Sequence, residues 1–344
     1  MPATAVVSHE DLSRQVTRIF AAHLVDADAR YVANCLIDAD ARGVSSHGIG
    51  RIPVYTRRLR EGVVNPRPAL TVSGGQGATA HLDGDNGMGY LVARKAMDEA
   101  IQRGREHGIG MVLASNSNHF GMAASYLQQA LDAGLGALVL TNAPPLMPVW
   151  GARAPFLGTS PFAFAAPGRL APIMLDMATS VVAFGKIRRA ARLGEPIPGD
   201  WALDAHGAPT TDPAAALDGV VLPMAGPKGS GLGLMMELMA GVMSGAAFGG
   251  QVRNQNTDFT RPQNVGHTFI TFRPDAALPM ADYLQRADEL VQRARALPLA
   301  DGFDCVHMPG ERENLAAARA RSEGLSISAA DLQMLKEELH LARA

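Results

Sequence analysis

Apolar residues recur along this chain at two spacings, and their alternation predicts helices interleaved with short buried strands. Between Leu12 and Phe20 the apolar positions follow helical spacing, and Ser8 with Asp11 forms a capping box ahead of them. Further helices are predicted over residues 26–43, 47–62, 89–107, 122–133 and 228–244, with two amphipathic helices after residue 311. Strands are predicted over residues 70–73, 78–83, 110–114, 137–141, 162–166, 173–176 and 268–272.

The alternation of strands and helices indicates an α/β protein. A chain of 344 residues exceeds the size at which a single hydrophobic core stops growing, so we expect two interleaved lobes. One is predicted to be mainly helical and built from both chain ends, residues 1–70 with 300–344. The other is an α/β region over residues 71–299.

The composition describes a globular chain with little to offer a highly charged partner. The net charge of −2 is spread as mixed signs, which gives no electrostatic footprint for nucleic acid or an anionic membrane. Cys35 and Cys305 are the two cysteines, and they lack a C-x-x-C partner, which argues against a disulfide framework and a thiolate zinc site. Because we find neither a signal peptide nor an apolar run of spanning length, we expect a cytoplasmic protein.

Residues 45–51, which read S-S-H-G-I-G-R, carry the most specific candidate chemistry. If the helix begins near His47, then Arg51 lies about one turn later on the same face. An arginine can bind a carboxylate bidentately while a histidine exchanges a proton with the neighbouring oxygen. Ser46 can cap the helix, bind the imidazole or touch substrate. The alternative is a polar helix start with a solvated arginine.

Two glycine-rich segments are candidates for binding phosphate. Gly75, Gly77 and Ala80 fit the G-x-G-x-x-A pattern, but no helix follows them, so the context of a dinucleotide fingerprint is missing. The segment G-P-K-G-S-G-L-G opens a predicted helix, where its backbone amides and Lys228 can hold a phosphate. Its spacing is not that of a Walker A loop, and close packing through glycines remains the alternative.

Three further segments place polar side chains near the ends of predicted strands. His119, in S-N-S-N-H-F-G, is a candidate for catalysis, for cofactor contact or for a turn. Asp176 can bind a ribose hydroxyl, whereas Thr179 is best explained as a helix cap. Lys186 becomes interesting only if it faces a cleft. None of the ten histidines has metal-ligand spacing, so we expect no metal site.

Six short motifs together resemble the malate/L-lactate dehydrogenase-like family, which is unrelated to the Rossmann dehydrogenases. In chain order they are S-H-G-I-G-R, S-N-H-F-G-M-A, L-G-T-S-P, L-D-M-A-T-S-V-V-A-F-G-K-I, G-P-K-G-S-G-L-G-L-M-M-E-L-M-A-G and M-P-G-E-R-E. The resemblance extends from about Leu12 to Leu339. It implies a nicotinamide-dependent oxidoreductase, usually a homodimer, whose cofactor-binding sheet lacks Rossmann topology. The cofactor is NAD or NADP, and we see no residue pattern that separates the two.

The resemblance also implies roles for individual residues. His47 is expected to be the acid/base with Ser46 beside it, Arg51 to bind the substrate carboxylate, and Thr159 to face substrate. Some members use the histidine at the position of His119 as the base. The residues implied to line or hold the cofactor are His119, Phe120, Gly121, Met122, Ala123, Asp176, Met177, Ala178, Lys228, Gly229, His307, Met308, Pro309, Gly310, Glu311 and Arg312.

These implications favour hydride transfer between NAD(P)H and a small 2-oxo or 2-hydroxy acid. A protonated imidazole suits proton delivery to the forming alkoxide, and Lys186 can stabilise the same oxygen. Reduction of a cyclic imine carboxylate is the alternative activity. The reductases that carry it out resemble one another in having an aspartate where this chain has Lys186, and this departure favours the 2-oxo or 2-hydroxy acid. Ser160 and Pro227 are further departures from the family pattern. An inactive binding protein and a metal-dependent hydrolase are the remaining alternatives.

Overall fold

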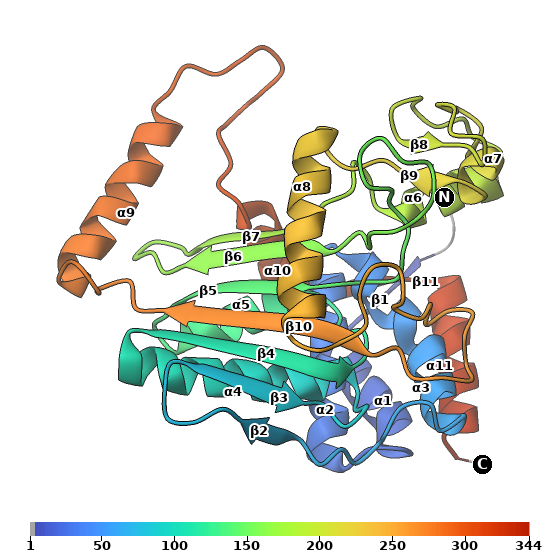
Figure 1. The fold of residues 1–344 in the computed structure, drawn as a ribbon, viewed down its shortest axis with the longest axis horizontal. Helices are drawn as coiled ribbons and strands as arrows, with labels where there is room; N and C mark the ends of the chain where they lie inside the picture. Colours follow the sequence, from blue (N-terminus) through green and yellow to red (C-terminus); the bar gives the residue numbers. More distant parts are fainter. Residues whose placement is uncertain (1–3, 344) are drawn as a thin grey trace.

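The computed structural model describes residues 4–343, and a seven-stranded sheet forms its centre (Figure 1). In spatial order the strands are β2 (Thr71–Ser73), β3 (Thr79–Asp83), β4 (Ile109–Ser117), β10 (Val265–Phe272), β5 (Gly136–Thr141), β6 (Pro161–Ala166) and β7 (Ile173–Ala178). Within this sheet β3 and β4 run parallel, and the other neighbouring pairs run antiparallel. The α/β class is confirmed, and the largely antiparallel order differs from the parallel sheet of a Rossmann domain.

The two faces of β10 contact different helices, as expected for a strand whose successive side chains alternate between faces. The Thr271 hydroxyl donates to the Ala100 carbonyl of α4 (Gly89–His107) at 2.6 Å. The Thr268 hydroxyl donates to the Met239 carbonyl at 2.9 Å, within the π-helix η3 (Glu237–Val242). Helix α5 (Ala124–Asp132) shares a hydrophobic core with α4, while α8 (Pro227–Met236) crosses the front of the sheet in Figure 1.

Both chain ends contribute to a second hydrophobic core beside the sheet. Its elements are β1 (Thr4–Val7), α1 (His9–Ala21), α2 (Asp26–Ala41), α3 (Ile52–Arg60), α10 (Glu311–Glu323), β11 (Leu325–Ser328) and α11 (Ala329–Leu341). Strands β1 and β11 pair antiparallel, which ties the two ends together. The predicted capping of α1 is confirmed, because the Ser8 hydroxyl accepts the Asp11 N–H at 3.1 Å. The division of the chain into two lobes stays a prediction.

The remaining elements lie outside these two cores. A small third core lies around α6 (Phe184–Leu193), β8 (Ala202–Leu203), α7 (Pro213–Leu217) and β9 (Val220–Val221). Helix α9 (Met280–Arg295) stands away from the body of the molecule in Figure 1, and none of its residues is buried. The sequence analysis missed α9 and the short elements of the third core.

Several predicted boundaries were wrong. No α-helix begins at His47: two 3₁₀ turns, η1 (Ser45–His47) and η2 (Ile49–Arg51), precede α3. Gly48 is extended between them, and Pro53 suits the first turn of the helix that follows. The helix predicted over residues 228–244 changes to π geometry after Met236.

Strand β4 is longer than predicted and runs to Ser117. The first three residues of the S-N-S-N-H-F-G motif are therefore strand, and only its last four lie in the connection to α5.

Candidate active site

A cavity of about 580 Å³ opens where the turn before α3, the β4–α5 connection, the ends of β5 to β7 and the start of α10 meet. The predicted site residues that line it are Ser46, His47, His119, Phe120, Gly121, Met122, Ala123, Thr159, Asp176, Met177, Ala178, His307, Met308, Pro309, Gly310 and Arg312. The predicted residues that do not line it are Arg51, Lys186, Lys228, Gly229 and Glu311. Its volume is typical of a small-molecule or cofactor site.

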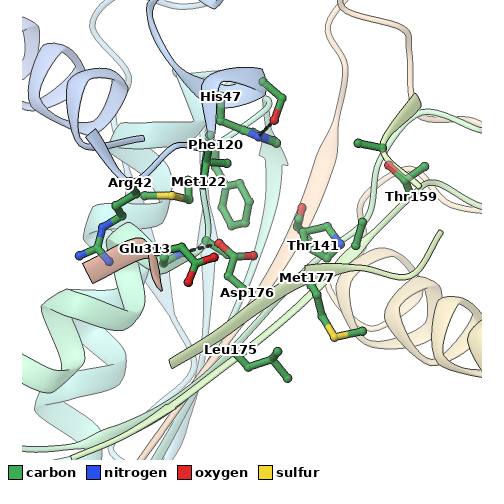
Figure 2. A pocket seen from close by; sticks show the side chains of 18 of the residues that line it. Arg42, His47, Phe120, Met122, Thr141, Thr159, Leu175, Asp176, Met177 and Glu313 are labelled. Carbon is green, nitrogen blue, oxygen red and sulfur yellow. Dashed lines mark hydrogen bonds between the residues drawn. The ribbon is translucent and has the colours of Figure 1, made fainter. Parts of the chain in front are cut away.

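Figure 2 shows that His47 lies apart from Arg42, Asp176 and Glu313 in this cavity. We call Ser46, His47 and His119 the histidine end, and Arg42, Asp176 and Glu313 the carboxylate end. The aromatic ring of Phe120 and the side chain of Met122 lie between them in the view.

The two histidines at the histidine end stack on each other. Their ring centroids are 5.5 Å apart and the ring planes differ by 13°. The Ser46 hydroxyl lies 2.9 Å from His47 Nδ1. Because this contact engages Nδ1, Nε2 is the nitrogen of His47 left for a ligand. Ser46 thus binds the imidazole, one of the roles considered from the sequence.

His119 is fixed by contacts on both its backbone and its ring. Its N–H donates to Gln263 Oε1 at 3.1 Å, and its Nδ1 lies 2.8 Å from the Tyr55 hydroxyl. The Gly121 N–H also points to Nδ1, at 3.3 Å. Since a backbone N–H can only donate, Nδ1 is an acceptor and the neutral ring carries its proton on Nε2. The Tyr90 hydroxyl donates to that of Tyr55 at 3.4 Å and extends the chain.

Gly121 is required by the path of this connection. Its φ is +79°, a conformation that L side chains rarely adopt. An added Cβ would also lie 2.4 Å from a ring carbon of Tyr90. The glycine therefore lets the chain turn over Tyr90 and present His119 and Phe120 to the cavity.

Burial keeps both imidazoles neutral. It lowers the pKa of His47 to about 4, with the positive charge of Arg51 as the second cause. Burial also lowers the pKa of His119 well below its usual value, assisted by Arg51 and by His47. At neutral pH each ring therefore has one unprotonated nitrogen and one N–H, so each can accept at one nitrogen and donate at the other.

Arg51 lies near the histidine end, but it is not on a helix face shared with His47 as predicted. It follows His47 across the extended Gly48, and its charge acts on both imidazoles. Its Nε is buried and has no hydrogen-bond partner within the described chain, while one terminal nitrogen lies 3.4 Å from Asn256 Oδ1. A half-buried guanidinium whose buried Nε–H is unused is suited to an anionic ligand.

At the carboxylate end, the side chain of Asp176 extends from β7 to the N-terminus of α5. Its Oδ2 accepts the Ala124 N–H at 2.8 Å, a contact drawn in Figure 2. Burial raises the pKa of Asp176 to about 6, against these backbone hydrogen bonds and the opposing charge of Arg42. The carboxylate of Glu313 lies beside it and raises the pKa further. Arg42 is itself bound to Asp38 and Asn314, each at 2.8 Å.

Several lining residues were not predicted, although the positions of some in the sequence could have identified them. Arg42 lies three residues before the S-S-H-G-I-G-R segment, and Thr141 ends β5 and Asn142 follows it, where ligand contacts are common in α/β proteins. Glu313 is the last residue of the M-P-G-E-R-E motif, but no role had been assigned to it. Gln263 had no such pattern, because it reaches His119 from a long irregular segment.

The two glycine-rich segments do not present free amides to the cavity. Gly229 donates its N–H to the Met224 carbonyl at 3.0 Å, and Pro227 has no N–H to offer. Lys228 is exposed on the first turn of α8. In the G-x-G-x-x-A segment, the Gly75 and Gly77 carbonyls accept from the Arg103 guanidinium, so the segment is the connection of a β-hairpin and not a phosphate loop.

Lys186 and Glu311 also lie away from the cavity. Lys186 is exposed on the first turn of α6, so its predicted role on the oxyanion stays a prediction. The Glu311 carboxylate accepts the Met308 N–H at 3.0 Å, which shapes the entrance to α10.

Residues 4–343 contain no group of three histidine, cysteine or acidic side chains placed to hold a metal ion. Over the same residues, no helix is long and apolar enough to cross a membrane.

The fold and the cavity define an α/β protein whose non-Rossmann sheet carries a site with paired imidazoles and carboxylates. The family model for malate/L-lactate dehydrogenase matches residues 7–336. The chain belongs to this family, and it is an NAD(P)-dependent oxidoreductase.

Three relatives illustrate the range of activities in the family. An L-sulfolactate dehydrogenase of Methanocaldococcus jannaschii is 38% identical over 91% of this chain and 90% of its own length. A ureidoglycolate dehydrogenase (NAD(+)) of Escherichia coli is 34% identical over 93% of this chain and 92% of its own. A (2R)-3-sulfolactate dehydrogenase (NADP(+)) of Chromohalobacter salexigens is 35% identical over 90% of each.

Two solved structures share the fold. The sulfolactate dehydrogenase of M. jannaschii superimposes with a TM-score of 0.92 at 34% identity, covering 98% of each chain. The Δ1-piperideine-2-carboxylate reductase of Pseudomonas syringae superimposes with a TM-score of 0.87 at 32% identity, covering 97% of this chain and 100% of the other. The family resemblance and the fold class inferred from the sequence are confirmed.

Proposed function

We propose that this enzyme transfers a hydride between a nicotinamide cofactor and a small 2-hydroxy or 2-oxo acid, with His47 as the acid/base. The observation that carries the proposal is the neutral, stacked histidine pair with the positive charge of Arg51 acting on both rings. The cofactor supplies or accepts the hydride. The protein positions the substrate and moves the proton.

The two histidines are assigned different roles from their hydrogen bonds. The Ser46 hydroxyl contacts His47 Nδ1, and we assign the imidazole proton to Nδ1, so that the Nε2 lone pair accepts the proton of a substrate hydroxyl. His119, with its proton on Nε2, donates a hydrogen bond to the same substrate oxygen. Arg51 binds the substrate carboxylate, which holds the reacting carbon toward the cofactor. In the reverse direction the protonated His47 returns the proton.

The cofactor is expected to lie along the cavity from the histidine end to the carboxylate end. Carboxylate oxygens of Asp176 and Glu313 can accept hydrogen bonds from a ribose diol, and Arg312 is available to a phosphate. Two neighbouring carboxylates disfavour the extra phosphate of NADP, so we expect NAD(H) to be preferred.

A cyclic imine 2-carboxylate is the second candidate substrate, supported by the structural similarity to the piperideine-2-carboxylate reductase. Such a substrate uses the same carboxylate anchor, and its imine nitrogen takes the place of the carbonyl oxygen.

One assay separates these possibilities. Purified enzyme is incubated with malate, lactate or sulfolactate and oxidised cofactor, and in parallel with piperideine-2-carboxylate and reduced cofactor, using NAD and NADP in each case. The proposal expects a 2-hydroxy acid with NAD to give the highest kcat/KM. Turnover of the imine alone would favour the second candidate, and cofactor binding without turnover would indicate an inactive binding protein.

We also propose that the enzyme is a homodimer. Helix α9 has no buried residue, and large apolar side chains are exposed on it and after it, among them Leu290, Leu297 and Phe303. A helix of this length depends on packing for its stability, and a second copy can supply that packing. Light scattering coupled to size exclusion tests the proposal, and a monomeric mass would contradict it.

A further inference from the structure

The two 3₁₀ turns that carry His47 and Arg51 are joined at Gly48, and a single carboxylate lies under this junction. Asp40, in the last turn of α2, accepts the Ile49 N–H on Oδ2 at 2.7 Å. Its carboxylate also lies flat against Gly48, where an added Cβ would be 2.0 Å from Oδ1 and 2.3 Å from Oδ2. The contact therefore depends on the absence of a side chain at Gly48.

This carboxylate is held where its charge is unfavourable. It lies at the C-terminal end of α2, the negative end of the helix dipole, and no salt bridge to it is found among residues 4–343. Burial, with the nearby charge of Asp331, raises the pKa of Asp40 to about 6. A carboxylate whose partial burial costs free energy is retained where its position is needed. Here that position fixes the Gly48–Ile49 junction between His47 and Arg51.

The other hydrogen bonds of the junction are backbone bonds within the turns themselves, such as that from the Arg51 N–H to the Gly48 carbonyl at 3.0 Å. The Gly48 N–H reaches the Ser45 carbonyl at 3.3 Å, and each 3₁₀ turn is only three residues long. No side chain of the junction itself caps either turn. The short contact from Asp40 is thus the side-chain bond that joins this junction to the rigid helix α2.

We propose that Asp40 is a positioning residue, whose acceptor oxygen holds the Gly48–Ile49 junction so that His47 and Arg51 face the same substrate. This inference rests on the proposed function, because it concerns the same two residues. Asp40 does not line the cavity, and its carboxylate is directed at the backbone of the junction.

Three variants test the proposal against His47→Asn as the reference. Asp40→Ala removes the acceptor and is expected to lower kcat/KM about 10- to 100-fold, the scale of a small misplacement of catalytic groups, with the cofactor Kd within about twofold. Asp40→Asn keeps one acceptor oxygen and is expected to recover most of the loss. Asp331→Asn removes the neighbouring charge without touching the junction, and its kcat is expected to stay within about twofold of wild type.

The double variant Asp40→Ala with His47→Asn gives the sharpest result. If Asp40 acts through the positions of His47 and Arg51, Asp40→Ala lowers kcat by a smaller factor in the His47→Asn background than in the wild type, whereas independent effects multiply. Multiplying effects, wild-type kinetics for Asp40→Ala, or an Asp40→Asn as slow as the alanine would overturn the inference. If Asp40→Ala does not fold, Gly48→Ala breaks the same contact from the other side and is expected to show the same non-additivity. If His47→Asn itself is not impaired, the proposed function fails instead.

Discussion

Burial shifts pKa values in opposite directions at the histidine end and the carboxylate end of the cavity. At both ends the shift favours the neutral form of the side chain. Burial lowers the pKa of His47 to about 4, so the imidazole is neutral throughout the physiological range. Burial raises the pKa of Asp176 to about 6, so this carboxylate changes charge just below neutral pH. The same loss of water therefore leaves one end insensitive to pH near neutrality and makes the other end sensitive.

The means of support differ between the two ends as well. At the histidine end, side chains hold the two histidines: the Tyr55 hydroxyl contacts the His119 ring, Gln263 accepts the His119 backbone N–H, and the adjacent Ser46 contacts the His47 ring. At the carboxylate end, backbone amides of α5 fix Asp176. Proton transfer thus depends on individual side chains, whereas cofactor contact depends on a rigid helix terminus. Substitutions at the two ends should consequently separate turnover from cofactor affinity.

The largest expected effect is that of His47→Asn. Loss of a general acid/base should lower kcat about 10²- to 10⁴-fold, or about 3–5 kcal/mol in the transition state, while the cofactor Kd stays near the wild-type value. Stopped-flow turnover and fluorescence titration of NADH measure the two quantities. Near-normal kcat would remove His47 from the acid/base role and transfer it to His119, for which His119→Asn is the matched variant.

Arg51→Lys tests whether the guanidinium anchors substrate at the histidine end. Lysine keeps the charge but loses the planar fork, so we expect KM to rise about tenfold and kcat to fall through misorientation. Steady-state kinetics at saturating cofactor measures both changes. Arg57→Lys is the control: Arg57 lies on α3, which follows the turn of Arg51, and its guanidinium lies over the Phe259 ring, so KM is expected to stay unchanged. Unchanged kinetics for Arg51→Lys would mean that another group binds the carboxylate.

Titration of the carboxylate end gives an intermediate effect. Above pH 6 the ionised Asp176 accepts hydrogen bonds from ribose hydroxyls and repels the additional phosphate of NADPH. Below pH 6 the protonated carboxyl is a weaker acceptor and has no negative charge to repel that phosphate. We therefore expect the ratio of NADPH Kd to NADH Kd to rise about fivefold between pH 5 and pH 7.5. Asp176→Asn should flatten this dependence without changing kcat to the extent that His47→Asn does. A pH-independent ratio in the wild type would separate Asp176 from cofactor selection.

The sequence predicted the fold and the chemistry of the site better than it predicted the geometry. Apolar periodicity located most elements around the sheet, because each of those elements buries one face. Helix α9 was missed, and it buries no residue within this chain. The motifs named His47, His119 and Asp176, all of which line the cavity. The support by Tyr55, Gln263 and Glu313 was missed, because those residues are distant in sequence and come together only in the folded chain.

The smallest expected effect lies outside both ends, at Lys228. Its side chain is exposed on α8 and does not line the cavity, so any contact with a cofactor phosphate is that of a mobile, solvated charge. Such a charge contributes at most about 1 kcal/mol, so Lys228→Ala should weaken NADH binding no more than about fivefold at low salt. Raised salt should remove the difference, because it screens exposed charges. Calorimetric titration at two ionic strengths, with the exposed Lys95→Ala as control, measures the effect. Equal affinities for wild type and Lys228→Ala at low salt would show that the glycine-rich entrance of α8 has no part in cofactor binding, whereas a large loss that persists at high salt would place Lys228 in a desolvated contact.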